Sequence, residues 1–84
     1  MQPMSAVRAY IMMNVKTGTE DEVCEKVLKF NEVEEAAAIY GEYDLVLKVA
    51  AKDMDKLDKL IVDRLRAIPD ILLTATMLIA KEYR

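Results

Sequence analysis

The chain has 84 residues, a formal net charge of −3 and charged side chains at 32% of its positions, with both signs interspersed. One cysteine and no histidine exclude an internal disulfide and the usual zinc frameworks. Without a basic patch, direct binding to nucleic acid is not expected, and no apolar stretch reaches the ~20 residues of a membrane span. The N-terminal residues Met1–Met4 are too few and too weakly charged for a signal peptide. We therefore expect one domain, residues 1–84, in the reducing cytoplasm, with no metal and no cofactor.

The first elements form a strand and a helix. Residues 6–15 (AVRAYIMMNV) carry β-branched, aromatic and methionine side chains with little polar alternation, which is typical of a strand covered on both faces. Gly18 then permits a turn, and Thr19 with Glu22 three residues later matches a capping box. This predicts a helix from about residue 20 to about residue 30. Its apolar stripe is formed by Val23, Val27 and Phe30, flanked by Cys24 and Leu28.

The rest of the chain reads as two strands, a helix and a last strand. Residues 33–40 and 44–50 are expected to form a hairpin around a turn at residues 41–44. Asp53 is placed to cap a second helix, which Pro69 ends. Residues 71–80 (ILLTATMLIA) form the last predicted strand. The apolar stripe of the second helix consists of Met54, Leu57, Leu60, Ile61, Leu65 and Ile68.

The order βαββαβ predicts a ferredoxin-like α+β fold, a four-stranded antiparallel sheet with two helices on one face. Two helices cover only one face of such a sheet, yet apolar residues fall on both faces in any register. Exposed apolar patches of this kind are rare on monomers, so a dimer that pairs two sheets is expected. The residues concerned are Tyr10, Met12, Val46, Leu72 or Leu73, and Met77 or Leu78.

The sequence offers little catalytic chemistry. Cys24 lies on the apolar side of the first helix, which favours a buried small hydrophobe over an activated thiolate. Four methionines, Met12, Met13, Met54 and Met77, fall on predicted core positions, which favours core filling over soft-metal binding.

Two polar features remain: the turn Gly41, Glu42, Tyr43 and Asp44, and the pair Thr74 and Thr76 on one face of the last strand. Each has a structural alternative. Gly41 could supply a positive φ and Asp44 could bond nearby amides, while the threonine hydroxyls could bond neighbouring strands.

These features resemble a known family. The segment IYGEYDLVLKV, a helix, and then IPDILLTATMLI match in order and spacing the effector-binding (RAM) domain of the Lrp/AsnC transcriptional regulators, over about residues 6–80. The resemblance implies sheet-paired dimers that assemble into rings, commonly octamers. It also implies that a free amino acid binds between dimers. Residues placed at or near this effector are Gly41, Glu42, Tyr43, Asp44, Thr74 and Thr76.

The family's full-length members carry an N-terminal helix-turn-helix domain, whereas here the sheet begins within the first ten residues. The chain therefore resembles a stand-alone RAM domain, and full-length regulators are its natural partners. In a zwitterionic effector, turn N–H groups and a threonine hydroxyl could hold the carboxylate, and Asp44 or Glu42 the ammonium.

Three functions are compatible with the sequence. The leading one is a non-enzymatic amino-acid sensor that acts in regulation through oligomerisation. A structural association module without a ligand is the second. The third is a small enzyme of the dimeric α+β barrel kind, which shares the topology but commonly uses polar groups in a cleft where this sheet is apolar.

Overall fold

The computed structural model describes residues 6–84, so the expectation for Met1–Met4 lies outside the described residues. The elements follow the predicted order βαββαβ, with a π-helical turn continuing the second helix. Their bounds are β1 Val7–Val15, α1 Glu20–Val27, β2 Val33–Ala38, β3 Leu45–Ala51, α2 Met54–Lys59, η1 Leu60–Leu65 and β4 Ile71–Leu78.

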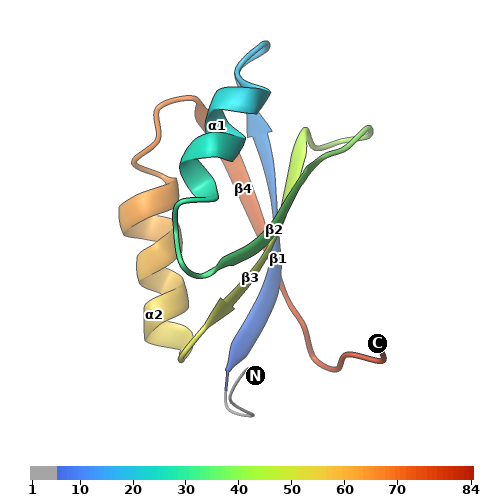
Figure 1. Ribbon diagram of the computed structural model, residues 1–84, viewed down its shortest axis with the longest axis vertical. Helices are drawn as coiled ribbons and strands as arrows, with labels where there is room; N and C mark the ends of the chain where they lie inside the picture. The colour runs from blue at the N-terminus through green and yellow to red at the C-terminus, as the bar shows by residue number, and fades with distance from the viewer. Residues whose placement is uncertain (1–5) are drawn as a thin grey trace.

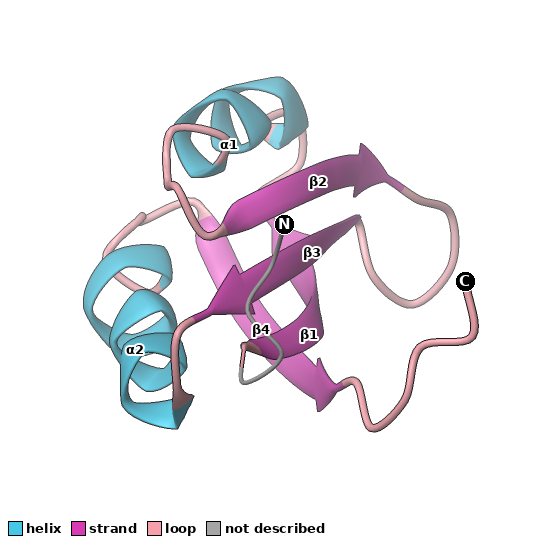
Figure 2. Ribbon diagram, turned by 60° about the horizontal axis from the view of Figure 1, so that its bottom comes forward, coloured by secondary structure: helices cyan, strands magenta, loops and turns pink. Residues whose placement is uncertain are grey.

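The strands form one antiparallel sheet in the order β2-β3-β1-β4. Both helices pack against the same face, and the opposite face is left without a covering layer (Figures 1 and 2). We call these the helix-covered face and the open face. The predicted ferredoxin-like fold is therefore confirmed.

The core lies between the helices and the helix-covered face. Alternate residues of the two central strands point into it, as the two-residue period of a strand requires. The helices contribute one apolar stripe each. The fully enclosed core side chains are Ile11, Met13, Leu45, Leu47, Leu57, Leu60, Leu65, Val23, Val27 and Val49.

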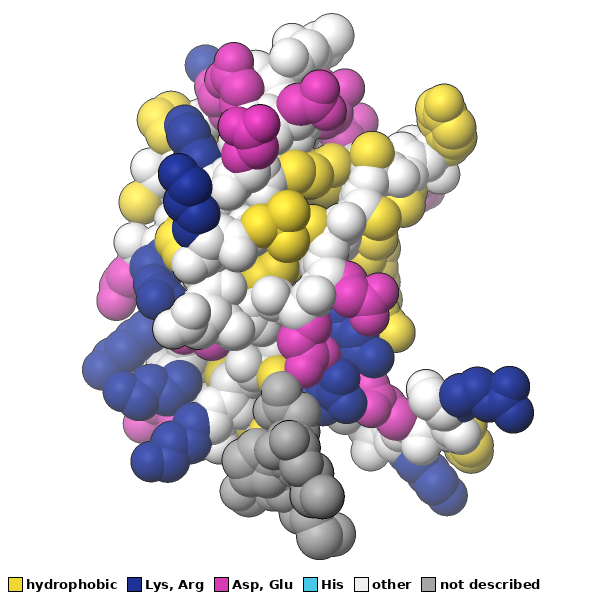
Figure 3. Space-filling model, viewed as in Figure 1, with side chains coloured by type: hydrophobic (Ala, Val, Ile, Leu, Met, Phe, Trp, Pro, Cys, Tyr) yellow, Lys and Arg dark blue, Asp and Glu magenta, His cyan; other side chains and the backbone are white. Residues whose placement is uncertain are grey.

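The strand register settles which residues lie on the open face. Tyr10 stands between Lys48 and Met77, and Met12 between Val46 and Ala75. Asn14 pairs with Leu73, whereas Val15 pairs with Ile71, so Leu72 is the extra residue of a bulge in β4. The two ambiguities of the sequence thus resolve to Leu73 and Met77. Apolar side chains run down the right-hand side of Figure 3, which is the open face seen edge-on.

Two expectations about core positions were wrong. Of the four methionines assigned to the core, Met13 is fully buried, but Met54 and Met77 are 44% and 51% exposed. Met77 faces away from the helices, and Met54 occupies the first, solvent-facing position of α2. Leu28, placed beside the apolar stripe of α1, is 53% exposed because the helix ends at Val27.

The start of α1 differs from the predicted capping box. The Thr19 hydroxyl donates to the carbonyl of Lys16 at 2.7 Å instead of capping the helix. Glu20, not Glu22, reaches back, and its carboxylate accepts from the N–H of Gly18 at 2.9 Å. The predicted cap at Asp53 is confirmed, since its carboxylate accepts from the N–H of Lys56 at 2.9 Å.

The second helix changes its hydrogen-bond pattern after Lys59. The turn η1 has π-helical spacing, and the N–H of Arg66 bonds the carbonyl of Ile61 at 3.0 Å. The side chain of Arg64 extends from this turn towards the segment before β2. Its guanidinium lies 2.9 Å from the Glu32 carboxylate and 4.9 Å from the centre of the Phe30 ring. The π-helical turn was not predicted.

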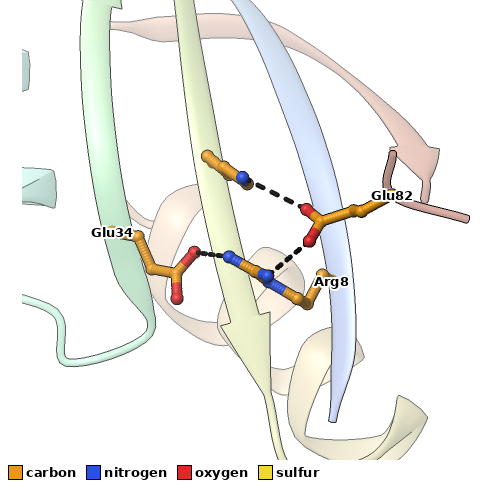
Figure 4. Close-up of polar contacts among 4 residues, drawn as sticks. Arg8, Glu34 and Glu82 are labelled. Carbon is orange, nitrogen blue, oxygen red and sulfur yellow. Dashed lines mark hydrogen bonds and ion pairs between the residues drawn. The ribbon is translucent and has the colours of Figure 1, made fainter. Parts of the chain in front are cut away.

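A cluster of four charged residues occupies one end of the open face (Figure 4). Arg8 of β1 lies 2.6 Å from Glu34 of β2 and 2.5 Å from Glu82 of the C-terminal segment. Lys48 of β3 lies 3.1 Å from Glu82. The hydrogen bond that Arg8 donates to Glu34 raises the pKa of Arg8, and the hydrogen bond that Lys48 donates to Glu82 raises the pKa of Lys48. The cluster ties three strands and the C-terminal segment together.

Candidate functional site

The predicted binding turn closes the β2-β3 hairpin. Six residues, 39–44, connect β2 to β3, and the N–H of Ile39 bonds the carbonyl of Asp44 at 2.9 Å. Gly41 has φ +136°, a conformation that L side chains rarely adopt. An added Cβ at Gly41 would meet nothing within 4 Å, so the requirement for glycine here is one of backbone conformation. The expectation that Gly41 supplies a positive φ is confirmed.

Asp44 connects this turn to the neighbouring strand. Its backbone N–H donates to the carbonyl of Met13, and one oxygen of its carboxylate accepts from the N–H of Val15, both at 2.9 Å. The Asp44 carboxylate therefore accepts a backbone hydrogen bond from β1 just before the start of β3, beyond the last residue pair of the β1-β3 ladder. Asp44 thus has a structural role in the hairpin, as the structural alternative anticipated. A carboxylate has about four acceptor sites, so this bond leaves it able to accept further donors.

A hollow of about 350 Å³ lies beside the turn. We call it the hairpin hollow. Its lining includes the acidic residues Glu20 and Asp44, together with Tyr40, whose side chain is fully exposed. Carboxylates attract cations, and the hollow has no basic residue in its lining. Its chemistry therefore suits a positively charged group.

A second hollow, of about 340 Å³, lies where the connection after η1 enters β4. We call it the β4 hollow. Its polar side chains are those of Arg66 and Thr74, and it contains no acidic residue. The remaining wall is apolar and consists of Ile71, Leu72 and Leu73.

The β2-β3 turn and the connection from η1 to β4 each contribute residues to one of the hollows. In Figure 1 both segments lie at the upper end of the sheet, the turn on the right and the connection on the left. They do not merge within one chain. Met13 of β1 pairs with Leu45 on one side and with Thr74 on the other, so two strand spacings of about 4.8 Å separate the start of β3 from Thr74. A single chain therefore holds the two sets of polar groups on the order of 10 Å apart.

The six predicted site residues are thus distributed unevenly. Asp44 lines the hairpin hollow and Thr74 lines the β4 hollow. Thr74 and Thr76 share one face of β4, as predicted, and their pairing with Met13 and Ile11 shows that it is the helix-covered face. Three members of the turn and the second threonine line neither hollow; they are Gly41, Glu42, Tyr43 and Thr76.

Among the charged and aromatic residues that line the hollows, sequence reasoning missed three, Glu20, Tyr40 and Arg66. Tyr40 had a signal, since it is an aromatic residue directly before the glycine of the turn. Glu20 and Arg66 had none, because each reaches its hollow through the packing of a helix end against a strand.

Other reactive groups are few. Burial raises the pKa of the Cys24 thiol, and the charge of Asp21 adds to this effect. Cys24 packs against the core, as predicted, and a raised pKa disfavours the nucleophilic thiolate. Within residues 6–84, no three cysteine or carboxylate side chains converge to hold a metal ion. In the same part of the chain, no helix is long and apolar enough to cross a membrane.

Comparison with known proteins decides the family. A family model described as the Lrp/AsnC ligand binding domain matches residues 8–84. The chain belongs to the Lrp/AsnC family. As a ligand-binding domain of this family, it is a non-enzymatic regulatory domain related to transcriptional regulators.

Two individual proteins are similar to this chain over most of its length. The HTH-type transcriptional regulator FL11 of Pyrococcus abyssi is 32% identical over 76 residues, which cover 90% of this chain and 50% of FL11. The chain thus spans about half the length of the curated relatives it matches. The crystal structure of FFRP-DM1 superposes with a TM-score of 0.84 at 44% identity, covering 87% of this chain and 97% of FFRP-DM1.

One structure of lower sequence identity was solved with a ligand. Transcriptional regulator NMB0573 from Neisseria meningitidis, in complex with L-Met, has a TM-score of 0.86 at 21% identity over 93% of this chain and 52% of NMB0573. At that identity the likeness establishes the shared fold alone.

Proposed function

We propose that this chain binds a free amino acid and couples that binding to its own assembly. The observation that carries the proposal is the division of complementary polar groups between the two hollows. One hollow has carboxylates and no basic residue, and the other has hydrogen-bond donors and no acidic residue. A zwitterion needs both sets, and one chain keeps them apart. The effector site would therefore be completed where two chains meet, and the complex of NMB0573 with L-Met supports this class of ligand.

The turn and the threonines have separate parts in this proposal. Asp44, assisted by Glu42, accepts from the ammonium of the effector through charge-assisted hydrogen bonds. Thr74 and Thr76, with backbone N–H groups of the turn around Gly41 and Tyr43, donate to its carboxylate. Because such a site exists only in the assembled form, effector binding would stabilise that form by mass action.

The assembly itself is proposed to begin with a dimer that pairs two open faces. Tyr10, Leu73 and Met77 expose 42%, 54% and 51% of their surfaces there. Pairing would remove this apolar surface from water and supplement the small core of an 84-residue domain. Dimers would then associate into a ring, for which the octamer is the expected size.

The regulatory partner is proposed to be a full-length Lrp/AsnC regulator in the cytoplasm. The net charge of −3 disfavours direct binding of this chain to DNA, so an effect on transcription would pass through a partner that carries a DNA-binding domain. Mobility shifts of duplex DNA at physiological salt, with this purified chain alone, would contradict that arrangement.

A screen of the twenty amino acids tests the proposal. Melting temperature and mass by light scattering are measured with each amino acid at millimolar concentration. At least one amino acid is expected to raise the melting temperature and to change the oligomer distribution. A mass near 9.6 kDa at micromolar concentration would contradict the proposed dimer.

A structural association module without a ligand is the second candidate. It is favoured by the bond between Asp44 and Val15, which gives the conspicuous carboxylate of the turn a role in the fold. An assembled chain that responds to none of the twenty amino acids would establish this alternative.

A further inference from the structure

The lysines around the start of α2 form a basic surface that the sequence conceals. In the segment KDMDKLDK, residues 52–59, basic and acidic residues alternate, so no basic run is visible. The helical repeat separates the two signs, because Lys56 and Lys59, three residues apart, lie on the same side of the helix. Both are exposed, as is Lys52. Dark blue side chains gather along the left side of Figure 3, where α2 lies in Figure 1.

Two adjoining hollows lie beside these lysines, with volumes of about 320 and 310 Å³. Lys56 and Glu32 line both of them, so we treat the two as one site and call it the lysine groove. Lys52 lines the first hollow alone, and Lys59 lines the second alone. Each volume is at the lower end of the range for small-molecule sites.

The charges of the lysine groove are not balanced within the chain. Its acidic residues are Glu32 and Asp63. The Glu32 carboxylate already accepts from the guanidinium of Arg64 at 2.9 and 3.1 Å. Among the described residues 6–84, none of the three lysines forms an ion pair, although Asp55 and Asp63 each stand four residues from Lys59. The groove therefore has three free ammonium groups and one free carboxylate.

This surplus of donors defines the chemistry of a ligand. An ammonium has three hydrogen-bond donors and no acceptor, and lysine binds phosphate as a point charge. The Cβ atoms of Lys56 and Lys59 are about 5–6 Å apart on the helix, so neighbouring ammonium groups suit a ligand with more than one phosphate. The lining contains no aromatic side chain on which a base could stack. The phosphates, and not an attached group, would thus carry the recognition.

We infer that the lysine groove binds a small polyphosphate, with Lys56 at its centre and Lys52 and Lys59 towards its two ends. The groove shares no residue with the hairpin hollow or the β4 hollow. Its helix packs on the face opposite the open face, so pairing of two open faces leaves these lysines exposed. The site is therefore separate from the proposed amino-acid site and from the proposed dimer contact.

Calorimetric titration of the intact chain with tripolyphosphate, at about 0.15 M salt and without metal ions, tests the site. Lys56→Gln is expected to raise the Kd about 10-fold, the scale of a lost hydrogen bond between charged groups. Lys52→Gln and Lys59→Gln should cost less, because each residue lines one hollow alone. The matched control is Lys29→Gln, which removes an exposed lysine beyond the end of α1 and should bind as the wild type does.

ATP is the second probe, since it carries the same number of phosphates on a nucleoside. It should bind about as tightly as tripolyphosphate, because the lining offers no ring to stack on adenine. Both affinities should fall as the salt concentration rises. An unchanged ligand-free melting temperature for Lys56→Gln excludes a loss of folding as the cause.

Three results would overturn the inference. Equal losses in Lys56→Gln and Lys29→Gln would show attraction by overall charge without a site. No binding of tripolyphosphate at millimolar concentration would remove the site outright. ATP binding more than about 10-fold tighter than tripolyphosphate would show that the nucleoside is recognised, against the assignment to phosphates alone. The screen with amino acids concerns other residues, so either proposal can fail while the other stands.

Discussion

Val46 and Leu47 are neighbours in β3, yet they meet different surroundings. Leu47 is fully buried under the helices, while Val46 is only partly buried on the open face, beside Met12. Both side chains are apolar, so composition does not distinguish the two faces of the sheet. The difference lies in what covers them, because the chain supplies helices for one face alone. An apolar face that its own chain leaves uncovered indicates where a second chain belongs.

The largest effect is expected from a substitution in the core under the helix-covered face. Leu47→Ala should lower the free energy of unfolding by about 2–5 kcal/mol, since it leaves a cavity between β3 and the helices. Chemical denaturation followed by circular dichroism measures this. The matched variant Val46→Ala should cost much less and should chiefly alter how the melting temperature depends on protein concentration. Equal losses in the two variants would contradict the comparison.

A charged side chain on the open face tests the proposed pairing of two open faces. Met77→Lys should dissociate the dimer, because pairing would bury an unpaired ammonium, while the folded monomer keeps the lysine in solvent. Light scattering should then report a mass near 9.6 kDa with an unchanged circular dichroism spectrum. Leu28→Lys is the matched control, since Leu28 is 53% exposed against 51% for Met77 but lies beyond the end of α1. Dissociation by both variants would show that the interface is elsewhere.

Two carboxylates of the β2-β3 turn, those of Asp44 and Glu42, differ in whether they bond the sheet. Asp44→Ala leaves the N–H of Val15 without its acceptor and should cost about 1–3 kcal/mol of stability with no ligand present. Glu42→Ala, an exposed carboxylate in the same turn, should cost almost nothing. Thermal melting with and without amino acid measures both effects, and the response of each variant is compared with its own ligand-free melting. An Asp44→Ala variant as stable as the wild type would remove the structural role assigned to this carboxylate.

The smallest effect is expected at the charged end of the open face. Glu82→Gln removes the partner shared by Arg8 and Lys48, but ion pairs near the surface contribute little to stability. The melting temperature should change much less than in Asp44→Ala and should lose part of its dependence on salt. A decrease as large as that of Asp44→Ala would show that the C-terminal segment is a structural part of the sheet.

Sequence reasoning recovers the fold because its signals are local and repeated. The two-residue period of β1 and β3, the cap at Asp53 and the glycine of the turn each act within a few residues. Failures occur where one residue more or less decides the outcome. The bulge at Leu72 shifts the register of β4, and π-helical spacing in η1 serves the same apolar stripe as an α-helix does.

The candidate site was only partly predictable for a different reason. Gly41 and Asp44 belong to a short turn whose chemistry is visible in four consecutive residues. Arg66 and Glu20 line their hollows only because helices pack on strands in the folded chain, so their spacing in the sequence does not reveal them. The separation of two strand spacings between the start of β3 and Thr74 is likewise a property of the strand order β2-β3-β1-β4.

The backbone at Gly41 has a consequence in terms of chirality. At φ +136° with nothing within 4 Å of an L-Cβ, the obstacle to a side chain is handedness and not space. A D-residue has the mirror-image conformational map, on which this angle is ordinary extended backbone. A chain of 84 residues is within reach of chemical synthesis, so D-alanine could be placed at position 41. It should preserve the hairpin that L-alanine strains, and by restricting the unfolded chain it should hold the turn more firmly than glycine does.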